Sequence, residues 1–299
     1  MEAQERSTAP FLALIPAQVF FGSLPVIGKI VLAVLPPMAL VGIRTSVTAI
    51  ILIAVQAFRR RIWLKERGDY LKLAILSLFG VVFNQLFFIS GLSLTSASNT
   101  SLLAVMIPVF ALTVGAVAGF ERLTWLKILG IIVAALGVII LLDPRKASFS
   151  SQTTLGDLCI VINCLAYGIY VATSKSVIVR NGTFRSMMWV FIFGAIVCAP
   201  LGAVSLSRID LTAVPAYVWW VSVYIAIGAT AAPYLLNAWA LQKVEPSTVA
   251  VYVYLQPLIG FVLAVLFLGE SLTLTFGIAA AFVFAGVFMV THKYVPLET

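Results

Sequence analysis

Residues 98–124, SNTSLLAVMIPVFALTVGAVAGFERLT, and residues 247–273, STVAVYVYLQPLIGFVLAVLFLGESLT, are two copies of one stretch of sequence. They align without a gap at an offset of 149 residues (247 − 98), which places Glu121 on Glu270. The same alignment continues downstream as far as Gly137. A repeat of this length shows that one structural unit occurs twice in the chain.

The earlier part of each copy also matches, at a slightly shorter offset. Gly22 corresponds to Gly168, so the offset in this part is 146 residues (168 − 22). The sequence therefore predicts two homologous units, residues 11–142 and residues 154–292, joined by a short connection.

The composition excludes a soluble protein. Hydrophobic residues make up 62% of the 299 residues and charged residues 10%, with a mean hydropathy of +1.11. Soluble domains have about one-quarter charged residues. A membrane-spanning helix needs about 20 apolar residues. Ten stretches of about that length lie near residues 11–34, 37–58, 70–93, 97–118, 124–142, 154–176, 184–206, 217–239, 247–268 and 273–292. We therefore predict an all-α integral membrane protein with ten transmembrane helices, five in each unit.

The positive charges indicate the topology. The 59–67 loop between spans two and three contains five Lys or Arg residues, whereas the loops on the opposite side contain only Arg145, Lys146 and Arg208. By the positive-inside rule, both termini are expected in the cytoplasm of a protein of the cell (inner) membrane. The net charge of +8 then favours acidic membrane lipids as partners, and not nucleic acid.

An odd number of spans in each unit has a direct consequence for the fold. After five spans, the second unit must enter the membrane in the opposite orientation to the first. Such an inverted repeat can hold a binding site near the middle of the membrane, with two nearly equivalent ways of opening to either side. The repeat therefore favours a transporter that works by alternating access.

Short motifs occur at corresponding places in the two units. An aromatic residue precedes glycine in the first span of each, as Phe21-Gly22 and Tyr167-Gly168, and Gly42-Ile43-Arg44 lies in span two. A Phe/Gly-Glu-x-Leu-Thr element closes spans four and nine, at residues 120–124 and 269–273. These motifs, in register over nearly the whole chain, resemble the drug/metabolite transporter superfamily, specifically its ten-helix EamA-type members.

The resemblance implies a central cavity surrounded by helices one to four and six to nine, with helices five and ten at the periphery. It also implies transport of a small organic solute. Bacterial members commonly export amino acids and related metabolites, sometimes toxic organic compounds, and other branches exchange nucleotide sugars or phosphorylated metabolites. The chain departs from the family at Phe21, where members often carry Trp, and Arg44 has no basic counterpart near Val190.

Polar and aromatic side chains at helical spacing mark the candidate cavity. Such groups are unfavourable in hydrocarbon and usually face the protein interior or a wet cavity. The candidates for substrate binding are Gln18, Phe21, Arg44, Asn84, Phe88, Asn163, Tyr167, Tyr170, Tyr234, Asn237, Tyr252 and Gln256. An interior rich in amides and aromatic rings suits a zwitterionic solute, whose ammonium group can pack on aromatic faces. The alternative is that each group serves only packing and interhelical hydrogen bonding.

Charged residues near the span ends predict two contacts between the units. Topology allows Lys29 near Glu270 on the outer side and Lys175 near Glu121 on the cytoplasmic side. We predict that these pairs act as alternating struts, one for each open state; the alternative is that each lysine extends to the nearest lipid headgroups. Arg44 either neutralises a carboxylate or phosphate of the substrate or bonds to helix-end carbonyls.

Three prolines are candidate hinges: Pro25, Pro108 and Pro257. Each removes a backbone hydrogen bond and permits bending. Pro108 and Pro257 correspond to each other across the repeat, which predicts a matched kink in spans four and nine. A static kink that serves packing alone is the other interpretation.

Several kinds of chemistry have no support in the sequence. The single histidine, His292, and three cysteines inside predicted spans provide no metal site, and no phosphate-binding Gly-Lys-Ser/Thr loop is present. No Asp or Glu lies in the middle of a span, so a carboxylate proton relay is not expected. We expect no cofactor and no catalytic residues, with a membrane-embedded enzyme as the alternative from a different class.

The leading prediction is therefore export of amino acids, aromatic ones among them, or of related metabolites. Exchange of nucleotide sugars or phosphorylated metabolites is the runner-up. A phosphate normally requires several cationic groups, and Arg44 and Lys29 are the only candidates for the cavity. We expect a monomer, although Gly115 and Gly119 form a small-x-x-x-small pair that would also suit a dimer.

Overall fold

The structure of the chain is a computed structural model that describes residues 8–142, 151–268 and 274–291. Every regular element in these ranges is a helix, as predicted. The first unit contains α1 (Ala9–Leu32), α2 (Pro37–Phe58), α3 (Gly68–Ser77), α4 (Asn84–Leu94), α5 (Ala97–Leu103), α6 (Met106–Val117) and α7 (Trp125–Leu142). The second contains α8 (Ser151–Asn181), α9 (Thr183–Leu206), α10 (Ala216–Ala226), α11 (Ala232–Leu241), α12 (Pro246–Val251), α13 (Leu255–Leu268) and α14 (Leu274–Thr291).

Nine helical segments in the described ranges are long and apolar enough to cross a membrane. They coincide with nine of the ten predicted spans, and the remaining span corresponds to the shorter apolar helix Pro246–Val262. The third span joins α3 to α4 through the π-helical turn η1 (Leu78–Phe83). The eighth joins α10 to α11 through a second π-helical turn, η4 (Ile227–Ala231). The predicted ten-helix membrane fold is confirmed, with boundaries that differ by a few residues.

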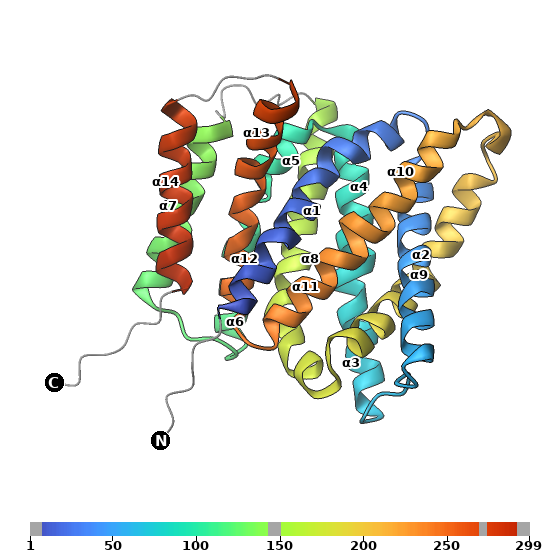
Figure 1. Cartoon of the computed structure of the whole chain (residues 1–299), viewed down its shortest axis with the longest axis horizontal. Coiled ribbons are helices and arrows are strands. Elements are labelled where there is room, and N and C mark those ends of the chain that lie inside the picture. The colour runs from blue at the N-terminus through green and yellow to red at the C-terminus, as the bar shows by residue number, and fades with distance from the viewer. Residues whose placement is uncertain (1–7, 143–150, 269–273, 292–299) are drawn as a thin grey trace.

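The two units are inverted with respect to each other, as α7 and α14 show. These helices are counterparts at the offset of 149 residues (274 − 125), and they pack side by side at one edge of the molecule (Figure 1). A Cβ atom on Gly130 would lie 2.8 Å from the Gly286 carbonyl, and one on Gly137 would lie 2.7 Å from the Ala279 carbonyl. A residue further along α7 thus contacts a residue earlier in α14, so the two helices run antiparallel. Because these counterparts run antiparallel, the units have opposite orientations.

Each unit places its first helix against the other unit. α1 packs on α11 and α13 of the second unit, and α8 packs on α4 and α6 of the first. A Cβ atom on Gly22 would lie only 3.3 Å from the Gln256 carbonyl, and one on Gly168 only 2.8 Å from Cβ of Phe110. The aromatic-Gly motif therefore marks two places where helices of different units approach closely.

The bundle has two ends, which we name by α1. The near end is where α1 begins and α2 finishes, and the far end is where α1 finishes and α2 begins (Figure 1). The 59–67 connection lies at the near end. The distribution of Lys and Arg predicts that this end is cytoplasmic.

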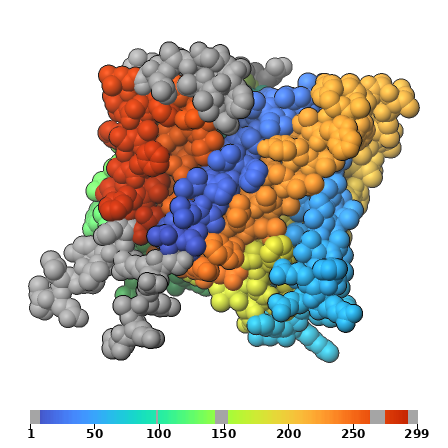
Figure 2. Space-filling model, in the orientation of Figure 1, coloured from blue at the N-terminus to red at the C-terminus, as the bar shows by residue number. Residues whose placement is uncertain are grey.

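Large apolar side chains cover the outside of the bundle. Figure 2 shows one face, formed by α14 in red, α1 and α2 in blue, and α10 and α11 in orange. On these helices Trp220 is 75% exposed and Phe288 63% exposed. Apolar surfaces of this extent are rare on monomeric soluble proteins. They fit contact with lipid hydrocarbon, as expected of a multi-pass membrane protein.

The prolines predicted as hinges occupy two kinds of position. Pro25 is buried within α1, where it removes a helical hydrogen bond. Pro108 and Pro257 are the third residues of α6 and α13, so they lie in the first turn of a helix, where proline is tolerated. The helical path is interrupted just before them, at residues 104–105 and at the 3-10 turn Tyr252–Tyr254. The sequence predicts a matched kink at Pro108 and Pro257, and the structure has a helix interruption just before each of them. A role of these prolines as hinges stays a prediction.

Candidate functional site

A cavity lies between the two units. It is lined by residues of α1, α2, α4, α5, α6, α8, α11 and α13, with one residue of the 3-10 turn, and contains, with its opening, about 600 Å³ of empty space. Eight of the twelve predicted substrate-binding residues line it: Phe21, Arg44, Asn84, Phe88, Asn163, Tyr167, Tyr234 and Gln256. The other described lining side chains are apolar except for Thr100, so Arg44 is the only charged residue among them.

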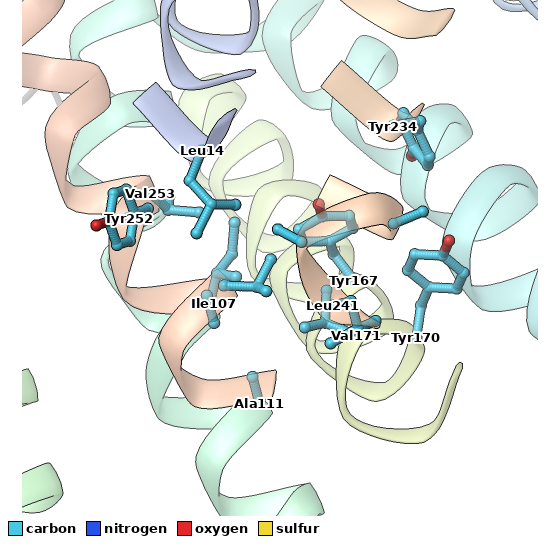
Figure 3. Close-up of a cluster of buried hydrophobic side chains, with 14 of the residues drawn as sticks. Leu14, Ile107, Ala111, Tyr167, Tyr170, Val171, Tyr234, Leu241, Tyr252 and Val253 are labelled. Carbon is cyan, nitrogen blue, oxygen red and sulfur yellow. The ribbon is translucent and has the colours of Figure 1, made fainter. Parts of the chain in front are cut away.

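Three of the four remaining predicted residues support the wall from behind. The Gln256 amide donates to Gln18 Oε1 (2.8 Å), and the Asn237 amide donates to the Tyr167 hydroxyl (2.9 Å). The ring of Tyr170 lies 6.0 Å from that of Tyr167. Tyr252 does not line the cavity in this conformation: it packs in the core apart from the other labelled tyrosines, with its hydroxyl pointing away from them (Figure 3), and its role in binding stays a prediction. The interruption before α13 changes the helical register there, so a regular periodicity misplaces this side chain.

Aromatic rings from both units meet on one side of the cavity. Phe21 of α1 makes edge-to-face contacts with Tyr234 of α11 (5.7 Å between centroids) and with Tyr167 of α8 (6.3 Å). Tyr167 and Tyr234 are themselves 6.3 Å apart, with Tyr170 beside them (Figure 3). Edge-to-face packing adds roughly 0.5–1.5 kcal/mol per pair beyond burial. These contacts hold the aromatic wall in a defined shape.

Arg44 is fixed at the wall by the second π-helical turn. Its Nε donates to the Thr230 hydroxyl (2.9 Å) and its Nη2 to the Ala229 carbonyl (3.4 Å), and the side chain is 2% exposed. A π-helical turn leaves backbone carbonyls without their usual helical partners, and η4 offers one of them to Arg44. Within the described ranges no carboxylate forms an ion pair with Arg44. A guanidinium has five N–H donors, so donors and a full positive charge are left for a ligand.

The first π-helical turn, η1, likewise provides a backbone carbonyl that accepts a hydrogen bond from a side chain of the cavity wall. The carbonyl of Gly80, which corresponds to Ala229 (80 + 149), lies 2.5 Å from the Tyr234 hydroxyl. That hydroxyl is also 2.9 Å from Asn84 Oδ1, and the Asn163 amide donates to the Asn84 carbonyl (2.8 Å). The two symmetric turns thus hold different groups, a tyrosine in one unit and an arginine in the other.

The cavity extends toward the far end, whereas the equivalent region toward the near end is packed. Residues Leu24, Thr100 and Ile160 line the far half of the cavity. Their counterparts in the repeat are Tyr170 (24 + 146), Val249 (100 + 149) and Leu14 (160 − 146). All three counterparts lie in one buried hydrophobic cluster. This conformation therefore has no open path between the cavity and the near end through these positions.

Glu121 fastens the two units together at the near end. Its carboxylate accepts from the backbone N–H of Ser247 (3.1 Å) and from the Ser247 hydroxyl, so it caps the start of span nine. Lys127 lies 2.5 Å from the same carboxylate and 2.8 Å from that of Glu245. In this conformation the cation beside Glu121 is Lys127, in the first turn of α7, and not Lys175. The strut between Glu121 and Lys175 stays a prediction.

The two symmetric lysines bond to helix ends. Lys175 Nζ donates to the Val244 carbonyl (2.7 Å), and Lys29 Nζ donates to the Thr95 carbonyl (2.6 Å). Thr95 and Val244 are themselves counterparts (95 + 149), so each lysine joins the first helix of its unit to the end of the third. A cation is favourable at the C-terminal end of a helix, where carbonyls lack partners. Glu270, the predicted partner of Lys29, lies outside the described residues.

The family of the chain follows from its sequence as a whole. Residues 8–143 match the EamA-like transporter family, and residues 154–292 match it a second time. The chain belongs to this family. It is therefore a membrane transporter of the drug/metabolite transporter superfamily, as its motifs predicted.

Relatives of this EamA transporter come from several kinds of organism. It is 26% identical to an uncharacterized transporter of Archaeoglobus fulgidus over 266 residues, covering 89% of this chain and 91% of the relative. It is 19% identical to the uncharacterized transporter YoaV of Bacillus subtilis over 288 residues, covering 95% and 97%. A crystal structure of 19% sequence identity matches its fold with a TM-score of 0.76 over 95% of this chain and 96% of the other. That likeness concerns the fold alone.

One buried acid of the EamA transporter was missed by sequence reasoning. Asp157 in α8 accepts from the Thr95 hydroxyl (2.6 Å) and from the Asn99 amide (3.3 Å), one helical turn before the lining residue Ile160. In the sequence Asp157 lies near the end of a predicted span, so it was not counted among the candidates for the site. Its counterpart in the repeat is Phe11 (157 − 146). An acid with an apolar counterpart was therefore the feature of the sequence that could have identified it.

A second missed cluster joins the units at the near end. Arg180 at the end of α8 donates from Nη2 to Asp69 Oδ1 (2.7 Å) and from Nε to Asp69 Oδ2 (2.9 Å). The Asn181 amide donates to the same carboxylate (2.7 Å), and Asp69 is fully buried. A two-pronged arginine–carboxylate contact fixes geometry as well as charge. It holds the end of α8 on the start of α3.

Proposed function

We propose that this EamA transporter exports amino acids, aromatic ones included, or closely related zwitterionic metabolites across the cell membrane. The observation that carries the proposal is Arg44, a buried guanidinium that is the only charged group among the described residues of the cavity wall. One guanidinium pairs well with one carboxylate, because its planar donors match the two oxygens.

The rest of the cavity wall suits the other parts of such a solute. The rings of Phe21, Tyr167 and Tyr234 offer faces and edges to an aromatic or aliphatic side chain, or to an ammonium group. A cation on an aromatic face contributes about 0.5–2 kcal/mol. The amides of Asn84 and Gln256 add hydrogen-bonding groups on opposite units.

A phosphorylated substrate fits this wall less well. A phosphate group normally needs several cations. Lys29, the other candidate, does not line the cavity, and its amine is bonded to the Thr95 carbonyl. Nucleotide-sugar or sugar-phosphate exchange is therefore the weaker alternative.

Alternating access follows from the inverted repeat in this proposal. The near end is closed by Glu121 on Ser247, and the symmetric contact would join Glu270 to Ser98 at the far end. We infer that closing the far end forms the second contact while opening the near end breaks the first. In this proposal each gating glutamate contacts the other unit through a serine at a helix start and not through Lys29 or Lys175, while Lys127 pairs with Glu121 from within the first unit. The unit would work as a monomer, with the whole path inside one chain.

Removing the Glu121 carboxylate is expected to loosen the near end. In Glu121→Ala the Ser247 amide loses its acceptor, at a cost of about 1–3 kcal/mol for a buried group. We expect hydrogen exchange at residues 246–251 to become at least roughly tenfold faster. Exchange followed by mass spectrometry of this segment measures the effect.

Glu245→Gln is the matched control for that experiment. It removes a carboxylate that pairs with the same Lys127 but leaves Glu121 on Ser247. Equal acceleration in both variants would show that the loss of negative charge matters and that the Glu121–Ser247 contact does not close the end.

Proteoliposomes test the proposed function directly. Purified transporter should carry labelled phenylalanine, tyrosine or tryptophan across the bilayer without chemical change. A selective ligand should also raise the thermal unfolding midpoint, because it binds only the native state. Stabilisation by a nucleotide sugar or a sugar phosphate, with none by amino acids, would favour the alternative. Formation of a new product would indicate an enzyme.

A further inference from the structure

A second hollow lies at the near end, apart from the central cavity. It is lined by the end of α2, the 59–61 segment, the turn between α8 and α9, and the last part of α11, and shares no lining residue with the central cavity. With its opening it contains about 900 Å³ of empty space. We call it the arginine pocket, because Arg59, Arg61 and Arg185 line it.

The three arginines of the pocket have no acidic partner among the residues that the structure describes. The nearby carboxylate of Asp69 is instead bonded to Arg180. Arg185 Nε donates to the backbone carbonyl of Arg61 (3.3 Å). This hydrogen bond does not involve the Arg61 guanidinium.

The polypeptide turn in the pocket adds to this positive potential. Gly182, at φ 82°, precedes the 24-residue helix α9, and no side chain caps the start of that helix. The N-terminal end of a helix carries partial positive charge and unpaired N–H groups. Thr183, Phe184 and Arg185 form its first turn and line the pocket.

One wall of the arginine pocket is apolar. Leu235, Leu236 and Trp239 of α11 form it, and the ring of Phe184 lies under the Arg59 guanidinium at 5.0 Å. Figure 2 shows the yellow segment near the α8–α9 turn between α11, in orange, and the near end of α2, in light blue. Phe58, beside Arg59, is 90% exposed. The apolar surface of α11 and α2 beside the arginines can thus contact the hydrocarbon part of an anionic ligand.

The inverted repeat contains no second arginine pocket. The counterparts of Arg59 and Arg61 are Ser205 (59 + 146) and Ser207 (61 + 146), and that of Arg185 is Ala39 (185 − 146). Basic residues in general gather on the cytoplasmic side of membrane proteins. Here three of them also converge on one hollow with an apolar wall, and their counterparts in the repeat at the far end are not basic.

We propose that the arginine pocket binds the phosphate group of an anionic phospholipid, with the acyl chains of that lipid against α11 and α2. Three guanidinium groups and a helix start match the charge and the oxygens of a phosphodiester. The apolar wall favours a lipid over inorganic phosphate. The proposal does not depend on which solute is transported.

Native mass spectrometry of the purified transporter with phosphatidylglycerol or phosphatidylcholine tests this site. We expect wild-type protein to retain phosphatidylglycerol and a triple variant, Arg59→Gln with Arg61→Gln and Arg185→Gln, to bind it at least roughly tenfold more weakly. Arg67→Gln with Lys72→Gln and Arg122→Gln removes three exposed cations elsewhere in the chain and serves as the control. It should retain the lipid almost as well as wild type.

Three results would overturn the proposal. They are equal retention of phosphatidylglycerol by the pocket variant, equal loss by the control variant, and displacement of the lipid by equimolar inorganic phosphate. Single Arg59→Gln and Arg185→Gln variants, each checked for an unchanged unfolding midpoint in phosphatidylcholine, replace the triple variant if it does not fold. Each is then expected to bind phosphatidylglycerol measurably more weakly than wild type.

Discussion

Arg44→Ala is expected to reduce transport by more than an order of magnitude. If the guanidinium pairs with the substrate carboxylate in a buried site, its removal leaves that carboxylate without a partner and costs about 2 kcal/mol or more. The rate at subsaturating solute should then fall by roughly 30-fold or more. Initial rates of amino-acid flux in proteoliposomes measure the loss. Arg44→Lys should restore only part of it, because an ammonium lacks the planar pair of donors.

Two further variants separate binding from architecture, since Arg44 also bonds to η4. Thr230→Val removes the hydroxyl that accepts from Arg44 Nε but keeps the guanidinium. If Arg44 acts on the substrate, Thr230→Val should transport much better than Arg44→Ala. Arg208→Ala removes an exposed arginine at the far end and should transport normally. Equal losses in Thr230→Val and Arg44→Ala, at equal thermal stability, would assign Arg44 to holding the π-helical turn.

The repeat made most of the fold predictable from the sequence. Apolar length gives the spans, and an odd number in each copy requires inversion, which the antiparallel contact of Gly130 with Gly286 confirms. Residues of the cavity were predictable for a similar reason. Amide groups in a span are unfavourable in hydrocarbon and usually face the interior, as Asn84, Asn163 and Gln256 do on the cavity wall.

The partners of the charged side chains could not be predicted in the same way. Topology gives the end of the bundle at which a charge lies, but helix crossing decides which of several groups at that end is within 3 Å. Lys127 therefore took the place of Lys175 beside Glu121, and helix-end carbonyls took both symmetric lysines. The π-helical turns are also invisible to helical periodicity, although they create the carbonyl that Arg44 uses.

Broken symmetry is the more useful guide to the substrate. Matched positions such as Gly22 and Gly168 serve contacts that both units need. Arg44 and Gln256 have the unlike counterparts Val190 and Ile107, and both line the cavity. Tyr252 is equally unmatched but lies in the core. An unmatched residue thus points to the site only if the local helix is regular enough to place it.

Gly202→Leu is expected to prevent α2 and α9 from packing. A Cβ atom at Gly202 would lie 2.7 Å from the Cα of Gly42 and 3.2 Å from the Met38 carbonyl. Ordinary carbon contacts are about 3.5–4.0 Å, so backbone atoms of two helices would have to move by roughly 1 Å. We expect a loss of about 3 kcal/mol or more, since no flexible side chain can yield. Thermal unfolding and the yield of monodisperse protein in detergent measure it.

Gly277→Leu is the matched control, because a Cβ atom there meets nothing within 4 Å. Leucine is the better helix former, so this variant should be at least as stable as wild type. Arg44 lies two residues beyond Gly42, so displacement of α2 in Gly202→Leu would also move the guanidinium away from η4. Transport and stability should therefore fall together. Lost transport at wild-type stability would instead mean that α2 slides on α9 during the cycle and that the leucine blocks this motion, which contradicts a fixed contact between these helices.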